Sequence, residues 1–147
     1  MRMRMMERSW EKQPYIGIIY NTGVILDLDE EDQLARIIDI EQGNIGSRFV
    51  HRFTRTNTRK KSMKIPNKVR VLLNTGAEGF IGVRLGEGPV SRVGFKTSKD
   101  GCMVFSKEWG IFVSTHNLEA GSAAVFTFRR SNTATFDVVC VVDILSI

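Results

Sequence analysis

The chain has 147 residues, of which 42% are hydrophobic and 25% are charged, and its formal net charge is +5. This composition excludes an intrinsically disordered chain and is typical of one globular domain of ordinary size with some additional residues. The apolar stretch over residues 15–28 is too short and too interrupted to be a secretory signal or a membrane span. We therefore expect a protein of the cytosol or nucleus with no membrane partner.

The net charge hides a strong asymmetry along the chain. Residues 1–46 carry five Lys/Arg against nine Asp/Glu, whereas residues 47–147 carry sixteen against seven. Between Glu41 and Glu78 there is no acidic residue, although nine Lys/Arg occur there. A solvated charge run normally mixes both signs, so this block favours a surface that binds a polyanion, and nucleic acid first.

Residues 1–46 are predicted to form an acidic N-terminal extension. Short strands are expected at 15–20 and 24–29, on either side of the turn sequence Asn-Thr-Gly. Residues 29–42 are predicted to form a helix that is acidic in its first turn. One face of this helix carries Leu34, Ile37 and Ile38. Three arrangements stay open for the extension: it packs on the main domain, it contacts a protein partner, or it stays flexible.

The remaining residues, 47–147, are predicted to be mostly β-structure. Alternating apolar residues and turn signals predict strands at 49–55, 79–85, 90–97, 102–106, 123–128 and 133–145. Several short strands at turn spacing favour a closed or nearly closed β-barrel or a sandwich.

Two short helices are predicted among these strands. Residues 65–74 have Pro66 at an early helical position, where its missing N–H costs nothing. One face of this helix is expected to carry Val69, Leu72 and Leu73. The second helix is expected to follow Ser106 as its N-cap. Its apolar face is formed by Trp109, Phe112 and Val113.

The sequence offers little for catalysis. The two histidines, His51 and His116, have no ligand-spaced cysteine or carboxylate nearby, and His51 on an apolar face is expected to be a hydrogen-bonded core or rim residue. Cys102 and Cys140 are expected to be free thiols. The acids of residues 47–147 are scattered rather than clustered for a divalent metal, so we expect no nuclease. We expect no enzyme, no metal, no cofactor and no small-molecule substrate.

Two segments are predicted to contact nucleic acid. Lys and Arg neutralise phosphates, whereas Thr, Ser and Asn donate directional hydrogen bonds, and Asn can also pair with an adenine edge. The first segment comprises Arg55, Thr56, Asn57, Thr58, Arg59, Lys60, Lys61, Ser62 and Lys64. The second comprises Lys96, Thr97, Ser98 and Lys99, at the tip of a predicted hairpin. The second is an ordinary polar turn unless the fold brings it beside the first.

Duplex DNA ranks above RNA or a single strand as the expected partner. A barrel that binds single strands needs aromatic residues interleaved with cations on one sheet face. In this sequence the phenylalanines alternate within the strands as core residues do, and the basic segment has no aromatic expected to be exposed.

Several motifs resemble those of the plant B3 DNA-binding domain over residues 47–145. The matching residues are Ile65-Pro66, Ser106, Trp109, Phe112-Val113, Asn117-Leu118, Gly121, Val125-Phe126 and Phe136. The resemblance implies a seven-stranded open β-barrel with two short helices that grips the major groove with two basic arms. These arms correspond to Arg55–Lys64 and to about Lys96–Asp100. It also implies a plant nuclear transcription factor without enzymatic activity.

The chain departs from the B3 pattern in places that matter for specificity. The Gly-Asp pair of the family is Gly121-Ser122 here, and Glu108 replaces the glycine before the tryptophan. The arm tips do not reproduce the base-reading residues of the better-known branches, so we expect DNA binding of modest sequence specificity. The alternative is a B3-fold module with weak or lost DNA binding that acts through protein contacts. Under this alternative, the acidic extension is hypothesised to cover the basic face.

Overall fold

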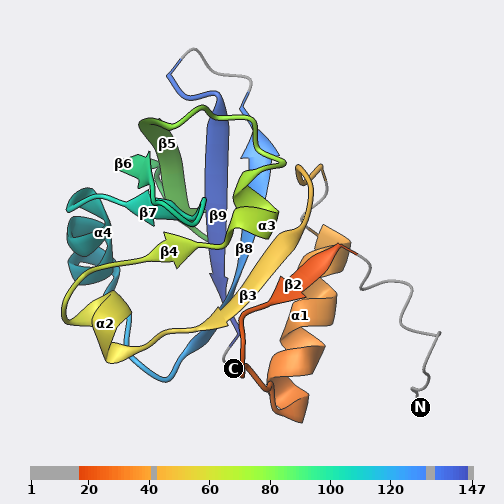
Figure 1. Cartoon of the computed structure of the whole chain (residues 1–147). Helices are drawn as coiled ribbons and strands as arrows, with labels where there is room; N and C mark the ends of the chain where they lie inside the picture. The colour runs from red at the N-terminus through yellow and green to blue at the C-terminus, as the bar shows by residue number, and fades with distance from the viewer. Residues whose placement is uncertain (1–16, 41–42, 132–134, 146–147) are drawn as a thin grey trace.

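In the computed structural model the eight strands of the described residues form one curled sheet. The structure describes residues 17–40, 43–131 and 135–145. The strands are β2 (Ile18–Tyr20), β3 (Arg48–Arg52), β4 (Lys64–Ile65), β5 (Glu78–Leu85), β6 (Ser91–Thr97), β7 (Met103–Phe105), β8 (Ala123–Arg130) and β9 (Val138–Ile144). Their order in the sheet is β2-β3-β8-β9-β5-β6-β7-β4. The sheet curls into an open half-barrel (Figure 1).

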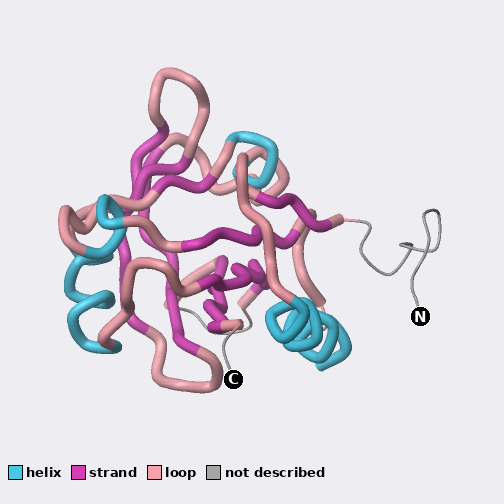
Figure 2. Tube along the Cα trace, turned by 90° about the horizontal axis from the view of Figure 1, so that it is seen from below, coloured by secondary structure: helices cyan, strands magenta, loops and turns pink. Residues whose placement is uncertain are grey.

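Four helices accompany the sheet in the same residues. They are α1 (Leu28–Ile40), α2 (Arg55–Thr58), α3 (Asn67–Arg70) and α4 (Glu108–His116). The α1 helix lies on the opposite side of the molecule from α2 and α4 in both Figure 1 and Figure 2. None of these helices is long and apolar enough to cross a membrane.

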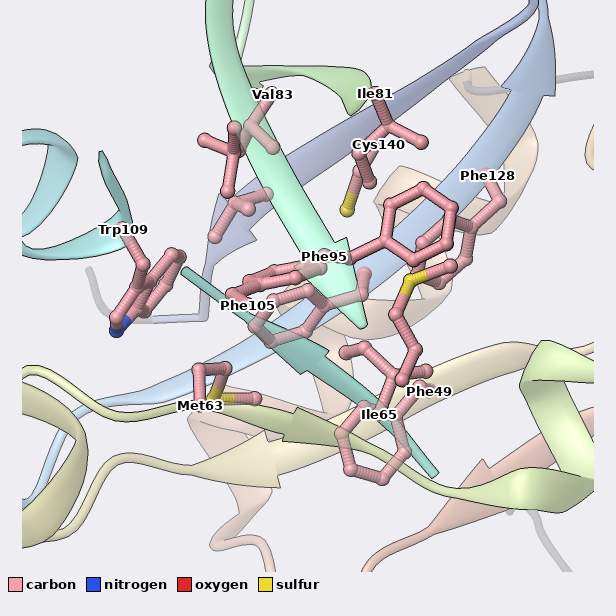
Figure 3. Close-up of a cluster of buried hydrophobic side chains, with 14 of the residues drawn as sticks. Phe49, Met63, Ile65, Ile81, Val83, Phe95, Phe105, Trp109, Phe128 and Cys140 are labelled. Atoms are coloured by element: carbon pink, nitrogen blue, oxygen red, sulfur yellow. The ribbon is translucent and has the colours of Figure 1, made fainter. Parts of the chain in front are cut away.

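The inside of the half-barrel holds the larger of two apolar clusters, shown in Figure 3. Alternation along the strands decides which side chains enter it, because successive side chains of a strand point to opposite faces. On β3, for example, Phe49 faces this cluster and Val50 faces the other side. Trp109 of α4 is fully buried within the cluster, and its indole ring centroid lies 5.6 Å from that of Phe105. The predicted apolar face of α4 is therefore confirmed.

The second apolar cluster joins α1 to the outer face of β3 and β8. Leu34 is fully buried there against Val50, Ala123, Val125 and Leu145. The β2 strand adds to this attachment, since it pairs in parallel with β3. Residues 18–40 are thus part of the folded unit rather than a loose tail.

The predicted fold class is confirmed, and the strand count needs one addition. Seven of the eight strands, β3 to β9, lie in the region predicted to be the barrel. The eighth, β2, comes from the N-terminal extension and extends the sheet beyond β3. The predicted helices at 29–42, 65–74 and after Ser106 are α1, α3 and α4 with shifted ends.

The strand predicted at 24–29 is wrong, because α1 begins at Leu28 instead. The Asp27 carboxylate accepts a hydrogen bond from the Glu30 N–H at 2.8 Å. The Glu30 carboxylate accepts one from the Asp27 N–H at 3.0 Å. This reciprocal pair is a capping box, which satisfies free N–H groups of the first helical turn.

Two smaller expectations also need correction. Leu72 does not share the buried face of Val69 and Leu73: it is 49% exposed, because α3 ends at Arg70. Ser106 is not the N-cap of α4, a position that Lys107 occupies. The Ser106 hydroxyl instead donates to the Glu108 carboxylate at 2.6 Å. The carboxylate also accepts from the Gly94 N–H at 2.8 Å, so Glu108 fixes α4 to β6.

The burial of Leu34 predicts a large stability cost for its truncation. We expect Leu34→Ala to lower the free energy of unfolding by about 2–4 kcal/mol, because the change removes a buried side chain and leaves a cavity. Leu28→Ala on the same helix is the matched control, since Leu28 is 84% exposed, and we expect it to change stability by less than about 0.5 kcal/mol. Urea unfolding measures both. Equal effects would show that α1 is not part of the cooperative unit.

Candidate nucleic-acid interface

The first basic segment starts with a helical turn, α2, that the sequence analysis did not predict. Thr54 is its N-cap, and the Thr54 hydroxyl accepts a hydrogen bond from the Asn57 N–H at 3.3 Å. The Asn57 side-chain oxygen accepts in return from the Thr54 N–H at 2.9 Å. Thr-x-x-Asn thus acts as a capping box in which Asn takes the place usually held by Glu or Gln.

The Asn57 side chain also closes the loop that follows α2. Its amide nitrogen donates to the Ser62 carbonyl at 2.9 Å, so one side chain joins the two ends of the segment 54–62. Its oxygen lies 2.7 Å from Nε2 of His51 on β3. The Asn57 backbone carbonyl accepts a hydrogen bond from the Trp109 indole N–H at 3.0 Å. The segment is therefore a braced arm rather than a free loop.

The Asn57 side chain is buried and engaged within the arm. Asn57 is only 8% exposed, and both ends of its side-chain amide have partners within the arm. An amide in this position has no free edge to present to a base. Asn57 therefore has a structural role in this conformation, and its predicted contact with DNA stays a prediction.

His51 is buried beneath the arm and is hydrogen-bonded at both ring nitrogens. Because the Asn57 oxygen can only accept, we assign the proton to Nε2 of His51. Nδ1 then accepts from the Asn21 side-chain amide at 2.9 Å, which suits a neutral imidazole. Burial lowers the pKa of His51 below its ordinary value of 6.5, and the hydrogen bond to Asn57 partly opposes that shift. The predicted core or rim role is confirmed.

Lys61 turns the chain at the far end of the arm. Its backbone has φ of 59°, in the left-handed region that residues other than glycine seldom adopt. Its side chain lies against Gly110 of α4, where an added Cβ would come within 2.7 Å of the Lys61 Cδ. Because Gly110 has no side chain, the aliphatic part of the Lys61 side chain packs against α4, and Lys61 remains exposed.

The cations of the arm face solvent. The exposed residues are Arg55, Thr56, Arg59, Lys60, Lys61 and Lys64. Thr58 and Ser62 are half-buried, and the Thr58 hydroxyl donates to the Thr54 carbonyl at 3.2 Å. The ion pair formed by Arg52 with Glu30 lies just before the arm, and no arm cation forms an ion pair with another described residue. The charge of Lys64 is a minor cause that lowers the pKa of Asp100.

The second basic segment is a tight turn whose hydroxyl groups are already engaged. The Ser98 hydroxyl donates to the Asp100 carboxylate, and the Thr97 hydroxyl donates to the Ala77 carbonyl at 2.7 Å. The hydrogen bond from Ser98 is the main cause that lowers the pKa of Asp100. Thr97 and Ser98 therefore shape the turn, and their predicted contact with DNA stays a prediction. Lys96 and Lys99 remain exposed.

The sheet brings the two segments together. Val104 of β7 pairs with Lys64 of β4 on one side and with Lys96 of β6 on the other. Residues in register across a sheet point to the same face, and two strand spacings separate the lysine backbones by about 10 Å. Both lysines are exposed, so they form one row on the outer surface, which we call the lysine row. Glu78 of β5 is next in register after Lys96.

Arg52 at the end of β3 was not identified from the sequence as a structural residue. Its guanidinium donates to both oxygens of Glu30, at 2.7 and 3.0 Å. It also donates to the carbonyls of Ile25 and Gly121, each at 2.8 Å. The hydrogen bond from Arg52 is the main cause that lowers the pKa of Glu30. These partners of Arg52 are all distant from it in sequence, so its structural role can be recognised only from the fold.

The position of α1 corrects the hypothesis that the acidic extension covers the basic face. The described part of the extension packs on β3 and β8 and holds Arg52, on the opposite side of the molecule from α2 (Figure 2). The part of the hypothesis that concerns residues 1–16 lies outside the described residues.

Groups suited to catalysis do not gather near the arm. Among the described residues no cluster of three or more His, Cys, Asp or Glu side chains could hold a metal ion. Cys102 and Cys140 are free thiols, as predicted. Burial raises the pKa of the Cys140 thiol well above its ordinary value, which makes this group a poor nucleophile.

The fold defines a mainly β protein of the open, pseudobarrel type with basic segments on its outer surface. No family model and no curated protein matches the chain. A solved structure described as that of a hypothetical protein from Arabidopsis thaliana matches with a TM-score of 0.52 and 20% sequence identity. The match covers 70% of this chain and 94% of that one. At this identity the similarity shows the fold alone.

The bracing of the arm by Asn57 can be measured. We expect Asn57→Ala to lower the free energy of unfolding by about 2–3 kcal/mol, because it leaves the buried His51 ring and backbone groups of Thr54 and Ser62 without their partners. It should also speed amide hydrogen exchange in residues 54–62. Thr56→Ala is the matched control, since the Thr56 side chain is exposed, and we expect less than about 0.5 kcal/mol. Unchanged exchange rates in Asn57→Ala would contradict the bracing role.

The lowered pKa of His51 makes stability depend on pH. The folded state favours neutral imidazole, so this contribution is complete above pH 6.5 and is lost as the pH falls through the lower pKa of the folded state. We expect the unfolding free energy to fall more steeply with acidification in the wild type than in His51→Gln, which keeps a donor without titrating. Urea unfolding from about pH 8 to pH 5 gives the comparison. Parallel curves would show that His51 does not titrate differently in the two states.

Proposed function

We propose that the chain is a non-catalytic, duplex-DNA-binding domain of a plant nuclear transcription factor. The lysine row is the observation that carries the proposal, because it joins two basic segments that are far apart in the sequence. Five further exposed cations belong to the same two segments: Arg55, Arg59, Lys60, Lys61 and Lys99. A one-sided cluster of this kind neutralises phosphates and releases counterions from DNA.

The arm supports binding to a duplex because it is braced. A loop that is already ordered loses less conformational entropy on binding than a flexible one. The capping box, the Asn57 side chain and the Trp109 indole hold the arm without using its cations. Those cations can therefore hold phosphates on either side of a groove.

The hydrogen bonds within the segments favour modest sequence specificity. Sequence is read by donors and acceptors that reach base edges, whereas phosphate contacts carry little sequence information. Asn57, Thr97 and Ser98 are engaged within the protein. Of the predicted polar contacts, Thr56 is the one whose side chain is exposed. We infer that the domain holds the DNA backbone more than it reads bases.

The sequence resemblance to plant B3 domains supports the nuclear, plant part of the proposal. The residues that carry it have structural roles in this fold: Trp109 and Phe112 are buried, and the Trp109 indole braces the arm. The shared motif therefore includes residues that shape the proposed binding surface.

A second candidate function is a protein-contact module. Its support is the exposed apolar side chains at the two ends of α1, where Ile25 and Leu28 are 81% and 84% exposed at the start and Ile40 is 71% exposed at the end. Exposed apolar side chains of this size are typical of contact sites when they lie together. Protein partners would then bind through α1, on the side of the molecule away from the arm.

The proposed function predicts a strong dependence of DNA affinity on salt. If about five phosphates are neutralised, log K for random duplex DNA should fall with log salt at a slope of about −4.5. Arg59→Gln/Lys60→Gln should reduce the magnitude of this slope by about 2, because two phosphate contacts are lost. Fluorescence anisotropy across a salt series measures both quantities.

The control for charge is Arg36→Gln, which removes an exposed cation from α1 on the opposite side of the molecule. It should leave the slope unchanged within about 0.5. Absence of duplex binding at low salt, or a slope that is the same in the arm variant and the wild type, would rule out the proposed interface.

A further inference from the structure

Phe80 departs from the expectation that the phenylalanines are core residues. It lies on the outer face of β5 and is 50% exposed. The guanidinium carbon of Arg92, on the neighbouring strand β6, lies 3.7 Å from the centroid of its ring. This is a cation–π pair on the surface of the sheet, and the combination of ring and guanidinium gives a planar, polarisable surface.

A hollow of about 460 Å³ lies on the outer side of the same sheet. Its charged lining residues are Arg84, Arg129 and Arg130, and its apolar ones are Val90, Phe136 and Val139. No carboxylate is among the described residues that line it. Two of its arginines are oriented by main-chain carbonyls: Arg84 donates to Gly86, and Arg130 donates to Leu73 at 3.3 Å.

The sheet register joins the hollow to the Phe80–Arg92 pair. Arg129, Val139, Gly82 and Arg92 are neighbours in register on β8, β9, β5 and β6. The absent side chain of Gly82 leaves room for Phe136, whose ring lies 3.0 Å from the place a Cβ would take. Three strand spacings separate Arg92 from Arg129, about 14 Å.

These residues form one surface, which we call the arginine face. Its members are Phe80, Arg84, Arg92, Arg129 and Phe136. Arg130 also lines the hollow, from the end of β8, where its register position alternates to the other side of the sheet. It differs in chemistry from the arm, where lysines outnumber arginines and no aromatic is present. Arginine stacks on planar groups and pairs with phosphate through two parallel donors, whereas lysine is a point charge.

We propose that the arginine face binds single-stranded nucleic acid. The bases of the strand stack on the exposed side of Phe80 and against Phe136, and the phosphates of the strand pair with the arginines. In a duplex the base faces are covered by their neighbours, so an exposed ring beside cations suits a strand with unstacked bases. An acidic peptide would use the charges but would have no need of the rings. The face adjoins the lysine row, since Arg92 and Lys96 both lie on β6.

The test measures binding of the full chain to three labelled probes: a strand of about 15 thymidines, an abasic strand of equal length and charge, and random duplex DNA. Phe80→Leu keeps apolar bulk at an exposed site and removes the ring, and Phe80→Tyr keeps the ring. We expect Phe80→Leu to weaken oligothymidine binding about fivefold or more, and Phe80→Tyr to change it less than about twofold. Affinity for the abasic strand and the duplex should stay unchanged in both.

Three results would overturn the proposal. They are no oligothymidine binding by the wild type at low salt, an equal loss on the abasic strand in Phe80→Leu, and an equal loss on the duplex in that variant. The last would make Phe80 part of the duplex interface. The arm variant Arg59→Gln/Lys60→Gln distinguishes this proposal from the proposed duplex interface. It should weaken duplex binding. In the same background, Phe80→Leu should still weaken oligothymidine binding.

Discussion

The hydrogen bonds of one buried amide, that of Asn57, hold the proposed interface in shape. This side chain caps α2, closes the loop to Ser62 and contacts His51 on the first barrel strand. A single residue can do this because a side-chain amide has separate donor and acceptor ends. The arrangement is made in the protein interior, where an unpaired polar group is costly, so the arm is ordered by the same constraint that orders the core. The surrounding cations need no partner of their own to keep their positions.

The register of the sheet likewise fixes the positions of the proposed binding residues that lie on the strands. The lysine row and the arginine face are assembled from strands that are adjacent in the order β8-β9-β5-β6-β7-β4, although several of them are distant in sequence. The inner sides of these strands are occupied by the apolar cluster of Figure 3, which fixes the register through alternation. A shift of one residue would move Lys96 inward and Phe95 outward. Core packing thus determines which charges reach the surface and where they meet.

Much of this architecture is predictable from local pattern. The alternation of Phe49, Val50 and His51, the helical spacing of Trp109 and Phe112, and the turn residues between strands give the barrel and its main helices. The charge pattern gives the two basic segments. The strand expected at 24–29 was wrong because alternation of apolar residues competed with a capping signal, Asp27-x-x-Glu30, which sets the helix start.

The details of the site depend on contacts that composition does not reveal. Asn57 and Ser98 have the chemistry of DNA-contacting residues, yet the fold uses their polar groups internally. Phe80 has the pattern of a core residue but occupies the outward position of β5, beside Arg92. The clamp of Arg52 on Glu30 joins residues 22 positions apart. Such pairings require knowledge of which strands are neighbours and in what register.

The parallel pairing of β2 with β3 also bears on how the chain avoids aggregation. Without β2, the β3 strand would end the sheet and expose a row of unpaired N–H and C=O groups to other chains. The β2 strand that takes this outer place has only three residues, and β4 at the other end of the sheet has two. Short terminal strands offer little length for an intruding strand to pair with. The segment that carries β2 therefore covers the edge of β3 and leaves only a three-residue strand at this end of the sheet.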